Sequence, residues 1–308
     1  TLETVGRFKR GQPGEAIHAD DRRRYYVLLY DWRKENLEAV RQLHALIEQI
    51  RRDYGDPDMP VDILAHSNGG LIANYSLRYG PNDVLGQEYF TPWDEGGKRI
   101  RRMVLLGTPA MGSVVSLERL QQGVKIALRT VPVEVLVTFA TPFETLPHPD
   151  AKVIYGPDGK LLDLNIYSVD TWRRHRWGVF SPEVEARVLA AAHGPETGAL
   201  QLAALHATFA RHLERARKLH MALAEPIHSH GVEVALFGGD CTLTPGRAVL
   251  DEKNGLRSLV VRPEEVQARV DGVDYERLLM QPGDGLVTRD SQLGRGLEVV
   301  PGQPGGTF

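Results

Sequence analysis

The stretch Val61-Asp62-Ile63-Leu64-Ala65-His66-Ser67-Asn68-Gly69-Gly70 decides the fold. It begins as a short apolar run that suits a buried strand, and residues 69–79 continue it in a helical pattern. Ser67 lies between the two, where a sharp turn would lift its hydroxyl above the carboxyl end of a sheet. Small residues are needed beside such a turn because the strand and helix backbones come close together, and Ala65 and Gly69 are small. The sequence therefore predicts a nucleophilic serine on a strand-to-helix turn.

Strands and helices alternate on both sides of this turn. Residues 25–30 form an apolar, aromatic-rich run, and residues 37–50 repeat apolar side chains at intervals of three and four. Further apolar runs cover residues 100–106 and 232–237. Strand, helix, strand, helix and strand in this order predict an α/β fold with a mainly parallel sheet, right-handed crossovers and flanking helices.

The alternation stops between the third and fourth of these apolar runs. Helical patterns interspersed with proline and glycine take over there, as expected for an inserted subdomain. Ser181-Pro182-Glu183 predicts a helix start, and an apolar stripe from Leu202 to Leu223 predicts a long helix. We therefore expect three parts: residues 1–112 as the first part of the core, residues 113–226 as a helical cap or lid, and residues 227–308 as the second part of the core.

The acid that would partner the serine is expected later in the chain, in the order serine, acid, histidine. Gly283-Asp284-Gly285 offers an aspartate in a tight turn, and Ser291 follows closely enough to brace it. A plain Asp-Gly turn would give the same pattern. Asp240, directly after the apolar run 232–237, is the alternative acid. The backbone N–H of Asn68, at the helix start, is expected to stabilise the oxyanion.

The histidine base has no clear candidate, because all eleven histidines precede Asp284. His66 adjoins the serine but cannot easily reach its hydroxyl from the correct side. Residues 1–21 contain no apolar strand followed by a glycine-rich loop, which would supply the second oxyanion donor. We therefore expect the early strands to be missing and the base to lie beyond Phe308, and we expect the chain as given to be inactive.

The remaining histidines do not predict a metal site. We interpret His206, His212 and His220 as residues on the polar face of the cap helix, because their spacings do not give the i, i+4 pair of a zinc helix. His228 and His230 fall on one side of an extended segment, but no cysteine or acidic run accompanies them. We predict no metal and no cofactor.

Composition excludes several classes of protein. The chain has 308 residues, of which 42% are hydrophobic and 25% charged, so it can bury a globular core. Its formal net charge of -3 gives no basic field for nucleic acid, and its single cysteine, Cys241, excludes an internal disulfide framework. No stretch reaches the roughly 18 apolar residues of a membrane span, and no signal peptide is visible. Compartment and oligomeric state stay open.

Four short strings, taken in order, resemble the lecithin:cholesterol acyltransferase family of lipid acyl hydrolases and transferases. They are similar to that family's Y-D-W-R signature, its serine motif, its G-x-P-x-x-G-S segment and its G-D-G-T-V acid motif. In this chain they read Tyr30-Asp31-Trp32-Arg33, Ala65-His66-Ser67-Asn68-Gly69, Leu106-Gly107-Thr108-Pro109-Ala110-Met111-Gly112-Ser113 and Gly283-Asp284-Gly285-Leu286-Val287. Each string is weak alone, but the combination is specific.

The resemblance implies an α/β-hydrolase fold with a mobile lid, a lipid acyl ester as substrate, Ser67 as the acylated residue and Asp284 as the acid. The chain departs from the family pattern at Ala65, where the family has Gly, and at Leu286, where it has Thr. It also lacks the cysteines that close the lid by a disulfide.

We interpret the chain as a serine acyl-ester hydrolase (lipase or esterase) or O-acyltransferase that acts on acylglycerol-like or phospholipid-like esters through a Ser-His-Asp mechanism. One alternative is a non-catalytic hydrolase-fold binding protein. Another is an esterase or amidase of different specificity on the same scaffold.

Residues 171–180 of the cap mix aromatic and cationic side chains and allow two interpretations. They could contact a lipid–water interface, or Trp172 and Trp177 could pack inside the cap. Trp32 could pack near the acyl pocket.

Overall fold

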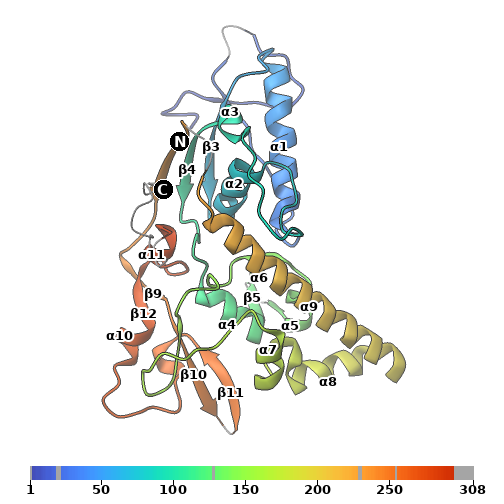
Figure 1. Ribbon diagram of the computed structural model, residues 1–308, viewed down its shortest axis with the longest axis vertical. Coiled ribbons are helices and arrows are strands. Elements are labelled where there is room, and N and C mark those ends of the chain that lie inside the picture. Colours follow the sequence, from blue (N-terminus) through green and yellow to red (C-terminus); the bar gives the residue numbers. More distant parts are fainter. Residues whose placement is uncertain (1, 19–21, 127–128, 228–230, 254, 295–308) are drawn as a thin grey trace.

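The computed structural model describes residues 2–18, 22–126, 129–227, 231–253 and 255–294 (Figure 1). The serine turn lies at the end of a three-stranded parallel sheet. The strands are β3 (Val61–His66), β4 (Ile100–Leu106) and β8 (Glu233–Phe237), in the order β3-β4-β8. The three apolar runs predicted as strands around the serine turn and after the cap therefore form one parallel sheet, as expected.

Helices α1 (Asn36–Asp53) and α2 (Asn68–Tyr79) pack together on one face of this sheet (Figure 1). The apolar stripe of α1 faces the core, because side chains three and four residues apart share one side of a helix. In α2 every residue from Gly70 to Tyr79 is buried. The short helix α3 (Gly96–Arg99) leads into β4. The apolar side chains of these elements form the first hydrophobic cluster of the molecule, the sheet core.

The strand predicted over residues 25–30 is wrong for most of its length. Only β2 (Arg24–Tyr25) is a strand, and it pairs with β1 (Lys9–Arg10) rather than with the parallel sheet. Residues 26–30 are extended and only one of their faces is packed, since Leu28 contacts the sheet core while Leu29 is 80% exposed. A buried parallel strand needs cover on both faces, and this segment has it on one.

Between β4 and β8 the chain folds into the predicted series of helices, with one small strand pair, β5–β6, and a further short strand, β7. The elements are α4 (Val114–Gln122), β5 (Val124–Ile126), β6 (Arg129–Val131), α5 (Val133–Leu136), α6 (Thr141–Glu144), β7 (Ile154–Tyr155), α7 (Val169–His175), the 3-10 turn η1 (Gly178–Phe180), α8 (Pro182–Ala191) and α9 (Pro195–Ala224). The Ser181 hydroxyl accepts a hydrogen bond from the Val184 N–H at 3.3 Å, so α8 begins where the sequence predicts.

The C-terminal part contributes strands to both halves of the molecule. Its elements are β9 (Thr242–Pro245), β10 (Ala248–Lys253), β11 (Leu256–Val260), the 3-10 turn η2 (Pro263–Glu265), α10 (Tyr275–Leu279), β12 (Met280–Gly283) and α11 (Arg289–Gln292). Strands β9 and β12 pair antiparallel, whereas β10 pairs with β11 and with β7 from the preceding segment. Ala248 and Leu259 of this part belong to the second hydrophobic cluster, the cap core, together with residues from the segment between β4 and β8. The division into three parts, with a boundary at residue 226, stays a prediction.

Helix α9 spans the two clusters (Figure 1). Its Phe209 and Leu213 lie in the cap core, and its Leu219 and Leu223 lie in the sheet core. His212 and His220 are 8% and 1% exposed, which corrects their assignment to a polar face. Burial lowers the pKa of His212 to about 4 and that of His220 to about 3, so both rings are neutral at pH 7.

The two cap tryptophans pack inside the protein. Trp172 is 0% exposed and donates its indole N–H to the Ile166 carbonyl at 2.7 Å. Trp177 is 3% exposed and donates to the Arg257 carbonyl at 2.7 Å. Neither ring is therefore available for a lipid–water interface. No helix within the described ranges is long and apolar enough to cross a membrane.

Replacing Trp172 by alanine should destabilise the protein by about 3–5 kcal/mol, because the change removes a large ring from a packed core. Leu200→Ala, at a position on α9 that is 72% exposed, should change stability by less than about 0.5 kcal/mol. Urea unfolding of both variants measures the difference. Equal stabilities would contradict the buried packing of Trp172.

Candidate active site

Ser67 occupies a strained turn between β3 and α2. Its φ and ψ are 54° and -126°, and it is one of three non-glycine residues with positive φ in the part of the chain that the structure describes. The Ser67 N–H donates to the Leu106 carbonyl at 2.8 Å, which ties the turn to the end of β4. The Ser67 carbonyl accepts from the Gly70 N–H at 3.0 Å. The sharp strand-to-helix turn that the sequence predicts is therefore present.

The tightest approach at this turn is at Gly70 and not at Gly69. A Cβ atom on Gly70 would lie 1.9 Å from the Thr108 hydroxyl oxygen, whereas one on Gly69 would lie 3.8 Å from the Ala65 Cβ. The expected crowding between positions 65 and 69 is thus an ordinary van der Waals contact. The demand for glycine comes instead from the segment after β4, which packs against the first turn of α2.

Gly70→Ala should destabilise the protein by about 1–3 kcal/mol, because the new methyl group must displace Thr108 from a packed site. Gly69→Ala is the matched control, and it should be neutral or slightly stabilising because alanine favours a helix more than glycine does. Thermal and urea unfolding of the two variants provide the comparison. A larger loss for Gly69→Ala would show that the crowding has been assigned to the wrong residue.

Asn68 is the first residue of α2, and its side chain is held by a neighbouring helix. The Asn36 Nδ2 donates to the Asn68 Oδ1 at 3.0 Å, and the Asn68 Nδ2 donates to the Asn36 Oδ1 at 2.7 Å and to the Tyr30 hydroxyl at 3.2 Å. N–H groups in the first turn have no partner within their helix. The arrangement suits the oxyanion role that we propose for the Asn68 N–H.

Asp31 and Arg33 form an exposed two-point ion pair. The Arg33 Nε and Nη2 atoms lie 2.8 and 2.7 Å from the two Asp31 carboxylate oxygens. These hydrogen bonds lower the pKa of Asp31 to about 2. The Lys34 N–H donates to the Asp31 carbonyl at 3.1 Å, so the pair closes the turn that leads into α1. Asp31 therefore serves to shape this turn.

The same turn is where the segment around α6 contacts the sheet core. The Ala140 N–H donates to the Arg33 carbonyl at 2.9 Å, and the Thr141 hydroxyl donates to the Trp32 carbonyl. The Trp32 ring packs edge to face on Phe139, with the ring centroids 5.4 Å apart. Trp32 is therefore a contact between the core and the cap.

A buried carboxyl group, Glu144 of α6, completes this contact. Both of its oxygens accept from the Asn36 N–H, at 3.0 and 3.1 Å. The pKa of Glu144 is raised to about 8, mainly by burial and to a smaller extent by the Glu35 charge, while the Asn36 hydrogen bond and Arg215 of α9 oppose the rise. Asn36 thus contacts Glu144 with its backbone and Asn68 with its side chain, which links the cap to the residue next to Ser67. The sequence analysis missed Glu144, because nothing in a helical segment marks a glutamate as buried.

Glu144 should make stability depend on pH. Its pKa lies above the usual 4.5, so the stability it contributes is full below about pH 4.5 and is lost as the pH rises through about 8. We expect a loss of up to roughly 1.4 kcal/mol per pH unit in this window. Glu144→Gln keeps an acceptor for the Asn36 N–H and should flatten the dependence in urea unfolding at pH 5–8.

Glu134→Gln is the control for this measurement. The Glu134 carboxylate pairs with Arg187 at 2.8 Å, and that hydrogen bond lowers its pKa. Its contribution is therefore lost only as the pH falls through the acid range, and the slope between pH 5 and 8 should survive the substitution. An unchanged slope in Glu144→Gln would contradict the assignment.

Asp284 follows β12 in a tight turn. Its Oδ1 accepts from the N–H groups of Leu286 and Val287 at 2.9 and 2.8 Å, and its own N–H donates to the Val287 carbonyl at 3.1 Å. Gly285 has a φ of 96°, which glycine adopts without strain. The turn therefore holds the Asp284 Oδ1 by two hydrogen bonds, and the Oδ2 atom takes part in neither of them.

Asp284 lies at the carboxyl ends of β4 and β8. A Cβ atom on Gly107, after β4, would be 3.3 Å from the Asp284 Oδ2, and one on Gly239, after β8, would be 3.2 Å from its Cβ. Gly107 directly follows Leu106, whose carbonyl binds the Ser67 N–H. Ser67 and Asp284 are thus both held against the end of β4, although 217 residues separate them in the sequence.

Ser291 does not brace Asp284, contrary to expectation. Its hydroxyl donates to the Gly112 carbonyl at 2.7 Å and accepts from the Met111 N–H at 3.2 Å. The Ser113 hydroxyl in turn donates to the Leu286 carbonyl at 2.7 Å. The segment after β4 is therefore joined to the Asp284 loop by two serines, and the role of Ser113 was not foreseen.

The other titratable candidates contribute no clear base or metal site. Asp240 is exposed and accepts a hydrogen bond from the Cys241 thiol at 3.3 Å. His66 is exposed at the end of β3, and His228 and His230 lie outside the described residues. Within the described ranges, no three or more His, Cys, Asp or Glu side chains gather in a way that could hold a metal ion.

Comparisons with known proteins agree with this architecture. Residues 23–151 match the family described as lecithin:cholesterol acyltransferase, which confirms the resemblance. Among solved structures, a chain in "The crystal structure of Tle4-Tli4 complex" is similar at 17% identity and a TM-score of 0.54, and the α/β-hydrolase fold is confirmed. The similarity covers 94% of this chain but only 64% of that one. No curated protein matches the chain.

Proposed function

Because residues 23–151 match the lecithin:cholesterol acyltransferase family, we propose that this protein is a serine acyl-ester hydrolase or O-acyltransferase acting on lipid esters. Acylglycerols and phospholipids are the substrate class. The observation that carries the proposal is the strained turn of Ser67 at the end of a parallel strand, held against the same strand end as Asp284. A turn of this kind presents a serine hydroxyl to a substrate above the sheet.

In the proposed mechanism the Ser67 Oγ attacks the acyl carbonyl carbon, and a histidine accepts the hydroxyl proton. Asp284 orients that histidine, which we do not assign to a residue of this chain. The Asn68 N–H donates to the oxyanion of the tetrahedral intermediate, and the side-chain pairing with Asn36 supports this role by holding the residue in place.

Collapse of the intermediate expels the alcohol, which takes the proton from the histidine, and leaves an acyl-enzyme on Ser67. Water or an acceptor alcohol then attacks the acyl-enzyme. Hydrolysis and acyl transfer share this intermediate, and the acceptor that the pocket admits decides between them.

The segment between β4 and β8 serves as the lid in this proposal. Its contacts with Trp32, Arg33 and Asn36 support the assignment, because they join the lid to the helix that pairs with Asn68. A movement of α6 would therefore shift Asn36, and with it Asn68, the residue next to the nucleophile.

A fluorophosphonate should label Ser67 once per chain in the full-length protein, because such probes phosphonylate activated serines with loss of fluoride. Ser67→Ala should abolish the label, and Asp284→Asn should slow labelling by about 10²- to 10⁴-fold. Asp240→Asn is the matched control and should label normally. Intact-mass and peptide mass spectrometry measure both the rate and the position.

Four outcomes would contradict parts of the proposal. A label that survives Ser67→Ala excludes the nucleophile, and slowing in Asp240→Asn alone moves the acid to that residue. Absence of any label favours a non-catalytic binding protein. Comparing nitrophenyl esters of short and long acyl chains with peptide amides tests the substrate class, and preferred cleavage of amides would replace a lipase by an amidase.

A further inference from the structure

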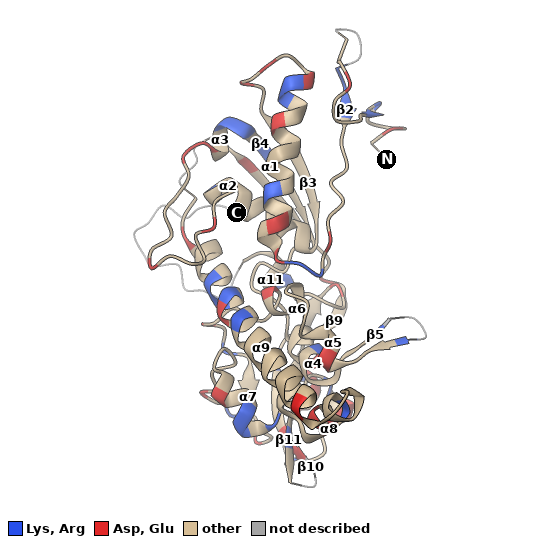
Figure 2. Ribbon diagram, turned by 90° about the vertical axis from the view of Figure 1, so that its right-hand side faces the viewer, with Lys and Arg blue, Asp and Glu red and all other residues tan. Residues whose placement is uncertain are grey.

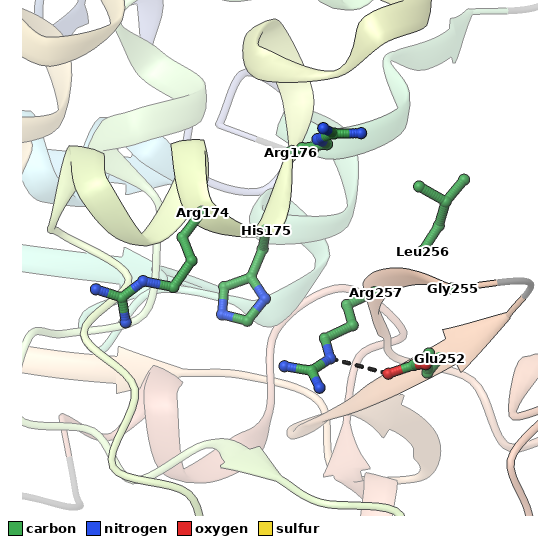
Figure 3. Close-up of a pocket in the computed structure, with 7 residues that line it drawn as sticks. All are labelled: Arg174, His175, Arg176, Glu252, Gly255, Leu256 and Arg257. Carbon is green, nitrogen blue, oxygen red and sulfur yellow. Dashed lines mark hydrogen bonds and ion pairs between the residues drawn. The ribbon is translucent and has the colours of Figure 1, made fainter.

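A pocket of about 310 Å³ opens between the end of α7 and the strands β10 and β11 (Figure 3). It lies at the end of the molecule away from the three-stranded sheet (Figure 1). Its lining is Arg174, His175, Arg176, Glu252, Gly255, Leu256 and Arg257. The pocket is thus built from two segments about 80 residues apart in the sequence that meet through the cap core.

The lining is strongly cationic. The lining contains three arginines and a histidine but one carboxylate, Glu252, whose Oε2 lies 2.9 Å from the Arg257 Nε. Within the described ranges, no ion pair or side-chain hydrogen bond engages Arg174 or Arg176. Figure 2 shows Lys and Arg on α7, next to the β10–β11 strands, among other places. Positive charge therefore accumulates here beyond what the protein itself neutralises.

Arg176 is held in a backbone conformation that favours glycine. It follows α7 with φ 56° and ψ 44°, and its N–H closes the helix by donating to the carbonyls of Trp172 and Arg173. Glycine is the usual residue at such a helix end because it has no Cβ to clash. Attraction to the helix dipole favours basic residues in the last turn of a helix. It does not account for an arginine at the position after α7, where glycine is usual. The backbone at Arg176 therefore carries a conformational cost that a glycine would avoid.

His175 forms the floor between the arginines. Its ring stacks on Trp177 with the centroids 4.7 Å apart, and Figure 3 shows it facing the Arg257 side chain. Burial lowers its pKa, and the charges of Arg257 and Arg174 lower it further. The ring is thus neutral at pH 7 and can donate one hydrogen bond to a ligand.

Arg176 also lines a second hollow of about 500 Å³ beside the first. Phe180, Pro182 and His206 are among its other walls, and the Phe180 and His206 rings stack at 4.5 Å. Arg173 and Glu185 complete its lining, so this second hollow is mixed in character. Together the two hollows have room for more than a bare anion.

We propose that the α7 pocket binds a phosphate-bearing anion through Arg174, Arg176 and Arg257, with His175 as an additional donor. Guanidinium groups match phosphate oxygens with paired N–H donors, and an arginine is more weakly hydrated than a lysine. The phosphate belongs either to a small soluble molecule or to a lipid headgroup. The site goes beyond the proposed acyl-ester chemistry, since none of its residues contacts the Ser67 turn.

Calorimetric titration of the full-length protein with inorganic phosphate tests the first source, and co-sedimentation with phosphatidylglycerol vesicles against phosphatidylcholine vesicles tests the second. Arg176→Gly and Arg174→Gln should each weaken binding about tenfold or more, because each removes charged hydrogen bonds. Arg176→Gly should also leave the thermal midpoint unchanged or higher, since glycine relaxes the backbone. A fold defect therefore cannot mimic the effect.

Arg211→Gln, at an exposed position on α9, is the matched control because it removes the same charge outside the pocket. Loss of phosphate binding in the two pocket variants alone supports a soluble ligand. Loss of phosphatidylglycerol binding without phosphate binding supports a lipid headgroup. Absence of binding to both probes, or equal weakening in Arg211→Gln, overturns the proposal.

Discussion

The hydrogen bond from the Ser67 N–H to the Leu106 carbonyl is the constraint on which the site depends. It continues the pairing of β3 with β4 by one residue, and it holds Ser67 at a positive φ that costs an ordinary residue about 1–2 kcal/mol. The close approach of Gly70 to Thr108 then sets where α2 begins. Since Asp284 rests against the residue after Leu106, the two proposed catalytic groups share one support. Neither can move without disturbing the end of β4.

The two hydrophobic clusters hold different parts of the protein. The sheet core holds the nucleophile turn, and the cap core holds α6 and the α7 pocket. Helix α9 crosses from one cluster to the other, and Glu144 contacts Asn36 beneath it. The cap is therefore joined to the site by a continuous helix and by one buried carboxyl group. Of these two links, the carboxyl group has a pKa raised to about 8 by burial, so its protonation changes near neutral pH.

The sequence predicted those features of the structure that depend on interactions between residues close together in the chain. The turn at Ser67, the helix after it and the cap of α8 at Ser181 depend on neighbours within a few residues, and all three are present. Residues 26–30 failed as a strand because strand formation depends on a partner that no local pattern names. Burial of His220 and the use of Ser291 depend on segments more than 70 residues away. The glycines on either side of Asp284 predicted a tight turn from local sequence. That this turn lies at the ends of β4 and β8 depends on distant segments and could not be predicted.

Each of the two sites that we propose contains a non-glycine residue with positive φ, but a strained backbone alone does not indicate function. Arg7, Ser67 and Arg176 are the three non-glycine residues with positive φ in the described ranges. Arg7 is exposed and directly follows the turn of residues 2–6. Ser67 and Arg176 differ from it because each ends or begins a helix beside other chemically active groups. A glycine at either position would relax the backbone and remove the one side chain able to reach those groups. The presence of serine and arginine at these strained positions agrees with the two roles that we propose.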